Sequence, residues 1–220
     1  FNMYNETLKR ILTSVILIPI LFYATVYSGV YLISLLILVY FLCAYEIIKN
    51  SRNIFFNIFA NIILIFSFYS FLFLRGNTDY SLTILFWILI TTFLSDTGGY
   101  IFGKAIKGKK LTKISPNKTY SGSIGSIILS CFSLPLLNLF QTFFSSGILV
   151  NFVKFDFLII TILISFVCQL GDLFVSFWKR KIMIKNISNI LPGHGGILDR
   201  IDGLIFVLIF CFILKLISLI

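Results

Sequence analysis

Residues 54–74, IFFNIFANIILIFSFYSFLFL, form an apolar run that contains no charged residue. A helix that crosses a bilayer needs about 20 such residues, so this run is long enough to span the hydrocarbon core. The rest of the chain has a similar character, because 59% of the 220 residues are hydrophobic and only 12% are charged. So few polar residues could not cover the surface of a water-soluble monomer. The sequence therefore predicts an integral membrane protein.

Further apolar runs of similar length predict about seven spans in one all-α, polytopic transmembrane bundle. The expected spans are Ile11–Tyr27, Val30–Ile48, Ile54–Leu74, Tyr80–Phe102, Ile124–Phe144, Phe157–Trp178 and Leu204–Ile220. Pro19 and Pro135 should kink the first and the fifth span, as membrane helices tolerate. We interpret residues 1–220 as a single membrane domain, with N-terminal spans at 1–94, catalytic motifs at 95–202 and a last span at 203–220.

The 18 basic residues are unevenly distributed among the loops. If the N-terminus is cytoplasmic, all of them except Arg75, Lys154 and Lys215 fall in or beside cytoplasmic segments. Lys and Arg accumulate in such segments, so the pattern predicts a cytoplasmic N-terminus. Most polytopic proteins share this bias, which therefore indicates an orientation and no particular function.

Several of the eight acidic residues fall within the expected spans or at their cytoplasmic ends, at Glu46, Asp96, Asp172, Asp199 and Asp202. A carboxylate at the centre of a span costs about 2.5 to 3.5 kcal/mol to insert, so it needs a partner or a water-filled cavity. Spacings of three and four place one set of polar residues on a single helix face: Ser165, Gln169, Asp172, Ser176 and Lys179. A hydrogen-bonded helix interface is the alternative for this face, but its carboxylate favours a functional cavity.

The fourth expected span carries a second intramembrane carboxylate. Asp96 shares a helix face with Thr92, Gly99 and Gly103. Close packing of small residues would explain the two glycines. It would not explain Asp96, which we interpret as part of the same polar site.

The segment KAIKGKKLTKISPNKTYSG, residues 104–122, combines lysines with Gly, Ser and Thr. Lysine charges, hydroxyl groups and backbone N–H groups near a helix start are suitable donors for phosphate groups. Attraction to anionic lipid headgroups is the alternative for Lys107, Lys109 and Lys110. Ser115, Lys118 and Thr119 lie just before the next span and are candidates for substrate binding.

The segment WKRKIMIKNISNILPGHGGILDRIDG, residues 178–203, contains the only histidine, His194, within a glycine-rich turn. This imidazole is a candidate for phosphate binding, or for capping the turn. Asp199 and Asp202 follow, three residues apart, with Arg200 between them. Carboxylates with this spacing share a helix face and can hold one cation, and oxygen ligands that retain water suit Mg²⁺.

Basic loops and carboxylates at one membrane face are typical of phosphoryl or nucleotidyl transfer, in which metal ions neutralise charge on the phosphates. Neither GxxxxGK[ST] nor GxGxxG is present, so no standard nucleotide-binding fold is indicated. A transporter would also explain intramembrane acids, but the long lysine- and glycine-rich loops argue against it. The residues alone predict a membrane enzyme that moves a phosphate-bearing group onto a lipid.

The stretch SFWKRKIMIKNISNILPGHGGILDRID, residues 176–202, resembles the signature of the phosphatidate cytidylyltransferases, or CDP-diacylglycerol synthases. SDTGGYIFGK, SPNKTYSG and QLGD resemble other blocks of this family and occur in the same order. The resemblance covers about residues 95–202. The family usually has Asp where this chain has Asn186, so a metal-binding role of that position is in doubt.

The resemblance implies transfer of a cytidylyl group from CTP to phosphatidate, with Mg²⁺ and room for a second cation. The implied catalytic residues are Asp172, Asp199, Asp202, Lys179, Arg180 and His194, of which the three Asp would bind metal. The implied substrate-binding residues are Asp96, Ser115, Lys118, Thr119, Ser176, Lys185, Gly195, Gly196 and Arg200. A CTP-dependent polyprenol kinase, or a cytidylyltransferase for another lipid, is an alternative.

The same resemblance implies a location and partners. We expect the bacterial inner membrane, with the active site facing the cytoplasm and in contact with membrane lipids. No nucleic acid is expected as a partner, and a homodimer is left open.

Overall fold

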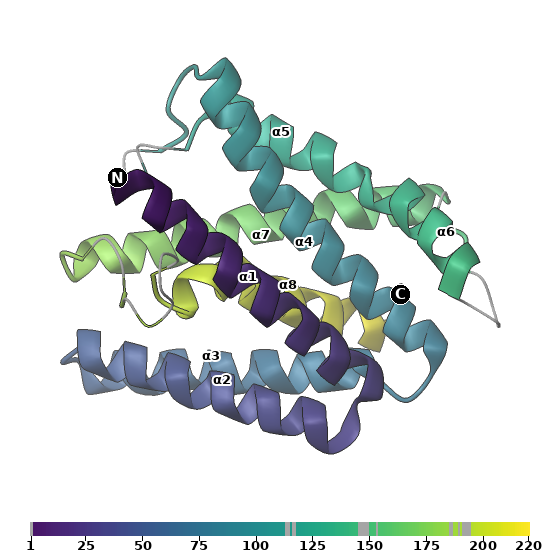
Figure 1. The fold of residues 1–220 in the computed structure, drawn as a ribbon, viewed down its shortest axis with the longest axis horizontal. Helices are drawn as coiled ribbons and strands as arrows, with labels where there is room; N and C mark the ends of the chain where they lie inside the picture. The colour runs from purple at the N-terminus through teal and green to yellow at the C-terminus, as the bar shows by residue number, and fades with distance from the viewer. Residues whose placement is uncertain are drawn as a thin grey trace.

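A computed structural model describes residues 2–112, 115, 118–144, 150–152, 154–184, 187–188, 190 and 195–220. These residues form helices, and an isolated β bridge joins Lys110 to Thr119. The helices are α1 (Asn2–Tyr27), α2 (Gly29–Asn50), α3 (Ile54–Arg75), α4 (Asp79–Ile106), α5 (Tyr120–Cys131), α6 (Ser133–Phe144), α7 (Phe155–Lys181) and α8 (Leu198–Leu216) (Figure 1). The all-α fold is confirmed.

Five helical segments of the described chain are long and apolar enough to cross a membrane. They are α2, α3, α4, residues 120–139 of α5 and α6 taken together, and α7. The described apolar part of α1, Val15–Tyr27, is shorter. Helix α8 has 19 residues but includes Asp199, Arg200, Asp202 and Lys215. The total of seven spans and the cytoplasmic N-terminus therefore stay predictions.

The fifth expected span is interrupted close to Pro135. Helix α5 ends at Cys131 and α6 begins at Ser133, with Phe132 between them. Pro135 has no N–H to donate to the carbonyl four residues earlier, that of Cys131, and its ring crowds that carbonyl. The helix is thus interrupted about one turn before Pro135, whereas α1 runs through Pro19 without a break.

Glycines allow α4 and α5 to approach until their backbones touch. A Cβ atom added to Gly98 would lie 2.5 Å from the carbonyl oxygen of Gly125, and one added to Gly122 would lie 2.8 Å from that of Gly99. Gly103 similarly faces Thr119 at the start of α5. The small-residue packing considered for Gly99 and Gly103 is therefore confirmed, and it holds Asp96 of α4 beside α5.

Helices α7 and α8 approach each other in the same way. A Cβ atom on Gly171 would lie 2.6 Å from the ring of Phe206, and one on Gly203 would lie 2.6 Å from the sulfur of Cys168. Each of these glycines adjoins a carboxylate in the sequence, Asp172 or Asp202. The glycines that bring the helices together therefore also bring the two carboxylates to one place.

Helix ends with polar side chains gather at one end of the bundle. The C-terminal ends of α2, α4 and α7 and the N-terminal ends of α3, α5 and α8 lie toward the left in Figure 1. Beneath them lies an apolar cluster that includes Cys43, Ile47, Leu64, Trp178 and Leu198. A larger apolar cluster around Trp87, Phe152 and Leu208 fills the opposite part.

Two of the basic residues expected at the outer membrane face cap helices in the opposite end of the bundle. Arg75 donates from Nε to the carbonyl of Thr25 at 2.5 Å and from Nη2 to that of Val26 at 2.8 Å, at the end of α1. Lys215 donates to the carbonyls of Phe73 and Leu74, at 3.3 and 3.2 Å, near the end of α3. Cations at helix C-termini satisfy carbonyls that have no partner within the helix.

Candidate active site

A polar cavity of about 410 Å³ opens among the gathered ends of α4, α5, α7 and α8. Its lining combines acidic, basic and hydroxyl side chains. The lining residues are Asp96, Gly99, Tyr100, Leu111, Ser115, Lys118, Thr119, Gly122, Ser123, Ser126, Gln169, Asp172, Lys179, Asp199, Arg200 and Asp202. Segments that are far apart in the sequence thus form one site, as the charged motifs predict.

One wall of the cavity carries an ion pair between the segment before α5 and helix α7. The ammonium group of Lys118 lies 2.5 Å from Oδ2 of Asp172. Backbone hydrogen bonds hold Lys118 in place, because its carbonyl accepts from Leu111 at 2.7 Å and its N–H donates to Ser115 at 3.0 Å. Thr119 then caps α5 by accepting from the N–H of Gly122 at 3.1 Å. The loop is therefore folded so that one lysine enters the cavity.

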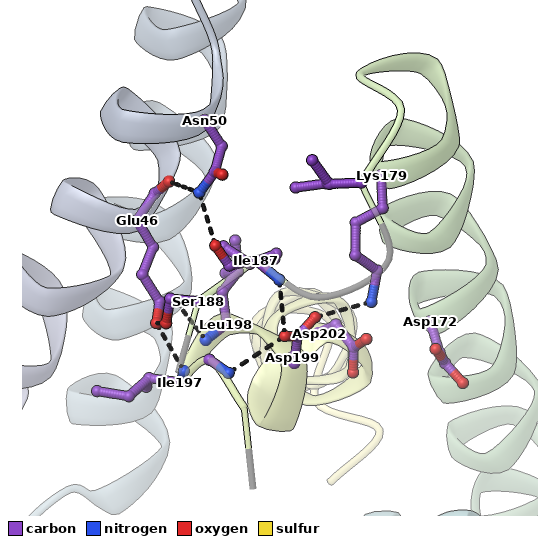
Figure 2. Close-up of polar contacts among 12 residues, drawn as sticks. Glu46, Asn50, Asp172, Lys179, Ile187, Ser188, Ile197, Leu198, Asp199 and Asp202 are labelled. Atoms are coloured by element: carbon purple, nitrogen blue, oxygen red, sulfur yellow. Dashed lines mark hydrogen bonds and ion pairs between the residues drawn. The ribbon is translucent and has the colours of Figure 1, made fainter. Parts of the chain in front are cut away.

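A second ion pair joins α7 to the start of α8. Lys179 lies 2.9 Å from Oδ1 of Asp199, and both side chains are almost buried. Oδ2 of Asp199 accepts from the backbone N–H groups of Ile187 and Gly196, at 3.0 and 3.2 Å. Figure 2 shows Lys179 reaching down to Asp199, with the loop segment of Ile187 beside them. Asp199 therefore anchors the connection between α7 and α8.

Asp96 and Asp202 bring two further carboxylates to the cavity. Oδ1 of Asp202 accepts from the N–H of Gly203 at 3.0 Å, and this side chain is nearly buried. Oδ1 of Asp96 accepts a weak hydrogen bond from the thiol of Cys168 at 3.3 Å. Both line the same cavity as Asp172. Carboxylates that share a cavity repel one another, which favours the binding of a cation there.

Neutral polar groups line the deeper part of the cavity. The hydroxyl of Ser123 donates to Oε1 of Gln169, while Ser95 and Ser165 form a 2.8 Å hydrogen bond farther along α4 and α7. The predicted polar face of α7 is thus divided, with Gln169 and Asp172 at the cavity and Ser165 in a helix interface. Tyr100, Ser123 and Ser126 also line the cavity but were not predicted, since hydroxyls within an apolar run do not identify themselves as site residues.

The cavity includes many of the residues predicted for the site: Asp96, Ser115, Lys118, Thr119, Asp172, Lys179, Asp199, Arg200 and Asp202. Arg180 and Ser176 are not among the described residues that line it; Arg180 donates to the carbonyl of Ile184 at 3.3 Å and Ser176 is buried. Gly195 and Gly196 lie next to the carboxylate of Asp199 and are not among the described residues that line the cavity. Lys185 and His194, like Asn186, lie outside the described residues.

The predicted Mg²⁺ has suitable oxygen donors at Asp172 and Asp202. Enzymes that act on nucleotides often hold Mg²⁺ with one or two carboxylates, completed by water and substrate phosphates. Among the described residues no group of three His, Cys, Asp or Glu is close enough to hold an ion alone. Both oxygens of Asp199 already accept hydrogen bonds. Metal binding by Asp172, Asp199 and Asp202 therefore stays a prediction, and Asp199 has the fewest oxygen lone pairs left for it.

Comparison with known proteins shows the family to which this chain belongs. The model of the cytidylyltransferase family matches residues 50–218. Phosphatidate cytidylyltransferase of Staphylococcus haemolyticus is 36% identical over 183 residues, which make up 82% of this chain and 68% of that protein. The protein of that name from Bacillus subtilis is 39% identical over 148 residues, or 67% of this chain and 52% of the relative.

The relative from Staphylococcus aureus strain COL, with the same name, is 34% identical over 177 residues, which cover 80% of this chain and 65% of the relative. The matches thus span between about half and two thirds of the length of these relatives. The described residues that line the cavity all lie within residues 50–218, the range that the family model matches. The chain belongs to the cytidylyltransferase family.

Proposed function

We propose that the chain transfers the cytidylyl group of CTP to phosphatidate, giving CDP-diacylglycerol and pyrophosphate. The observation that carries this proposal is the cavity, in which Lys118, Lys179 and Arg200 lie beside Asp172 and Asp202 at the ends of apolar helices. Such a site can hold a polyphosphate next to the headgroup of a lipid. The family match and the names of the relatives support the same reaction.

In the proposed reaction a phosphate oxygen of phosphatidate attacks the α-phosphorus of CTP, and the bond to the β-phosphate breaks. The attacking phosphate is already ionised, so the chain need not supply a general base. Lys118, Lys179 and Arg200 would hold the phosphates in line and stabilise the charge of the departing pyrophosphate. Mg²⁺ held by Asp172 and Asp202 would supply further neutralisation of the phosphate charge.

Product analysis tests the reaction. Purified protein in detergent is incubated with Mg²⁺, CTP labelled in the cytosine ring and one lipid acceptor at a time. We expect labelled CDP-diacylglycerol and one pyrophosphate per lipid when phosphatidate is the acceptor. Labelled CDP with a phosphorylated polyprenol would instead identify a lipid kinase. Solute flux across proteoliposomes without CTP turnover would identify a transporter and overturn the proposal.

Lys118 should matter more for CTP than for the lipid. Its ammonium group lies in the cavity against Asp172, so Lys118→Ala removes a cation from the proposed triphosphate site. We expect KM for CTP to rise by about 10- to 150-fold, with a smaller change in KM for phosphatidate, as loss of one charged hydrogen bond of about 1.5 to 3 kcal/mol would produce. Lys109→Ala is the control, because Lys109 is exposed on the same segment. Equal rises in both KM values would assign Lys118 to the lipid headgroup.

We also propose that the cavity end of the bundle faces the cytoplasm of a bacterium, which supplies CTP. Single cysteines at Lys109 and at Met183, which is 95% exposed, should react with an impermeant maleimide only after the membrane is opened. A cysteine at exposed Asn77, in the opposite end between α3 and α4, should react in intact cells. The reverse pattern would refute this orientation.

A further inference from the structure

Glu46 is a buried carboxylate that the proposed reaction does not use. It lies in the last turns of α2, its side chain is 0% exposed, and it is not among the described residues that line the cavity. It also precedes residue 50, where the family match begins. A buried carboxylate is costly unless several hydrogen bonds replace its water. The groups that bond to it should therefore show what it does.

Among the described residues, the donors to the Glu46 carboxylate come from the α7–α8 connection and the start of α8. Oε1 accepts from the backbone N–H of Ile197 at 3.0 Å and from the hydroxyl of Ser188. Oε2 accepts from the N–H of Leu198 at 2.9 Å. One turn along α2, Asn50 donates to the carbonyl of Ile187 at 2.8 Å. Figure 2 shows these side chains pointing from α2 toward the connection and the start of α8.

Helix α8 has no cap of its own at this end. Its N-cap residue, Ile197, has no side chain that could accept a hydrogen bond from the first turn. The first N–H groups of a helix lack partners within the helix, and they carry the positive end of its dipole. Glu46 supplies the missing acceptor and a negative charge from a different helix. The position of the start of α8 is therefore set by α2.

Gly196 is enclosed by two carboxylates. A Cβ atom at this position would lie 3.0 Å from Oε1 of Glu46 and 3.1 Å from Oδ2 of Asp199. Glu46 thus holds the chain from one side and Asp199 holds it from the other, through the N–H of Gly196. Asp199, Arg200 and Asp202 follow within the next turns and line the cavity. A shift of the start of α8 would displace all three.

The geometry points to Glu46 as a positioning residue, which fixes the first turn of α8 and thereby places Asp199, Arg200 and Asp202 at the cavity. This role goes beyond the proposed cytidylyl transfer and rests on it only for its effect on turnover. The described donors to the Glu46 carboxylate are Ser188, Ile197 and Leu198, and none of them is among the described residues that line the cavity. Its effect should therefore be transmitted by the position of α8.

Two substitutions test this role. Glu46→Gln keeps the shape, but its amide NH₂ must face a backbone N–H group, donor against donor. Ser188→Ala removes the hydroxyl that donates to Glu46 and accepts from the N–H of Ile190. Loss of groups that orient a catalytic shell typically costs about 10- to 100-fold in activity, and we expect kcat of Glu46→Gln to fall by that factor. Ser188→Ala should lower kcat less. The double variant should lose less than the product of the two factors, because both changes break one network.

Hydrogen exchange provides a readout that does not depend on the reaction. Exchange of the amides of Ile197 and Leu198 should accelerate at least tenfold in Glu46→Gln, while amides in α3 and α4 keep wild-type protection. Asp156→Asn is the matched control, since Asp156 is an exposed carboxylate in the first turn of α7. It should change neither exchange at α8 nor kcat.

Wild-type exchange at Ile197 and Leu198 in Glu46→Gln would overturn the positioning role, whatever the turnover. So would wild-type kcat in Glu46→Gln, or strictly multiplicative effects of Glu46→Gln and Ser188→Ala. If wild-type protein fails to convert CTP and phosphatidate, the proposed reaction is wrong, while the exchange measurements still decide whether Glu46 holds α8.

Discussion

Asp202→Asn should lower turnover with CTP and phosphatidate by about 100- to 1,000-fold, the usual effect of removing one preorganised electrostatic group from an active site. Asp202 is nearly buried at the cavity, and the charges of Asp96 and Asp172 act on it. Asn has almost the same shape but no charge, so the proposed cation would lose affinity while the helices stay packed. Asp172→Asn should have a similar effect and should also release Lys118 from its ion pair.

Titration with Mg²⁺ separates a metal ligand from a structural carboxylate. For Asp172→Asn and Asp202→Asn we expect half-maximal activity to require several-fold more Mg²⁺ than wild type. Asp199→Asn should lower activity with an unchanged Mg²⁺ requirement if Asp199 acts only through Lys179 and the backbone of Ile187 and Gly196. Asp156→Asn, at the other end of α7, should leave both quantities unchanged. Near-normal activity of both cavity variants at limiting Mg²⁺ would remove these carboxylates from the mechanism.

Gly98→Ala should destabilise the bundle and inactivate most of the protein. The added methyl group would lie 2.5 Å from the carbonyl oxygen of Gly125 and 2.8 Å from Cβ of Leu129, and a backbone carbonyl cannot rotate away as a side chain can. Overpacking of this kind costs about 1 to 3 kcal/mol. Separating α4 from α5 would also move Asp96 away from Lys118 and Ser123, so activity should fall even in the folded fraction.

The loss of stability is measured by heating the detergent-solubilised protein and using size-exclusion chromatography to quantify how much stays folded at each temperature. Ala105→Ser is the control, because it adds one heavy atom at an exposed position of the same helix. We expect a melting temperature several degrees lower for Gly98→Ala and an unchanged one for Ala105→Ser. Equal stability of the two variants would show that close packing at Gly98 does not hold α4 and α5 together.

The sequence predicts the helices well because length and hydropathy determine them. The run at 54–74 coincides with α3 within one residue, and Pro135 accounts for the break at Phe132. The last expected span begins at Leu204, whereas α8 begins at Leu198, so Asp199 and Asp202 lie at the start of this helix, as their spacing predicts. Asp199, Arg200 and Asp202 lower the hydropathy of its first turn, while Glu46 supplies the acceptor that this turn needs. Such a distant partner leaves no local pattern.

The site is predictable where a charge is out of place in a membrane segment. Asp96, Asp172 and Asp202 could be identified because an intramembrane carboxylate needs a reason, and all three line the cavity. Ser123 and Ser126 could not, since single hydroxyls are common in membrane helices. The different roles of Asp199 and Asp172 also escaped prediction. Only coordinates reveal that one accepts backbone hydrogen bonds and the other faces a lysine.

The bond between Glu46 and the first turn of α8 changes what counts as the smallest working part of this molecule. The described residues that line the cavity all lie in the stretch from Asp96 to Asp202, so that stretch looks self-sufficient. The start of α8 nevertheless donates hydrogen bonds to Glu46 of α2, a helix that is given no part in the proposed reaction. A chimera that combines the motif-bearing half of one homologue with the N-terminal half of another should therefore be inactive, unless helix α2 comes from the same homologue as the motifs. The two halves of the chain are thus not independent units, because the Glu46 carboxylate connects them.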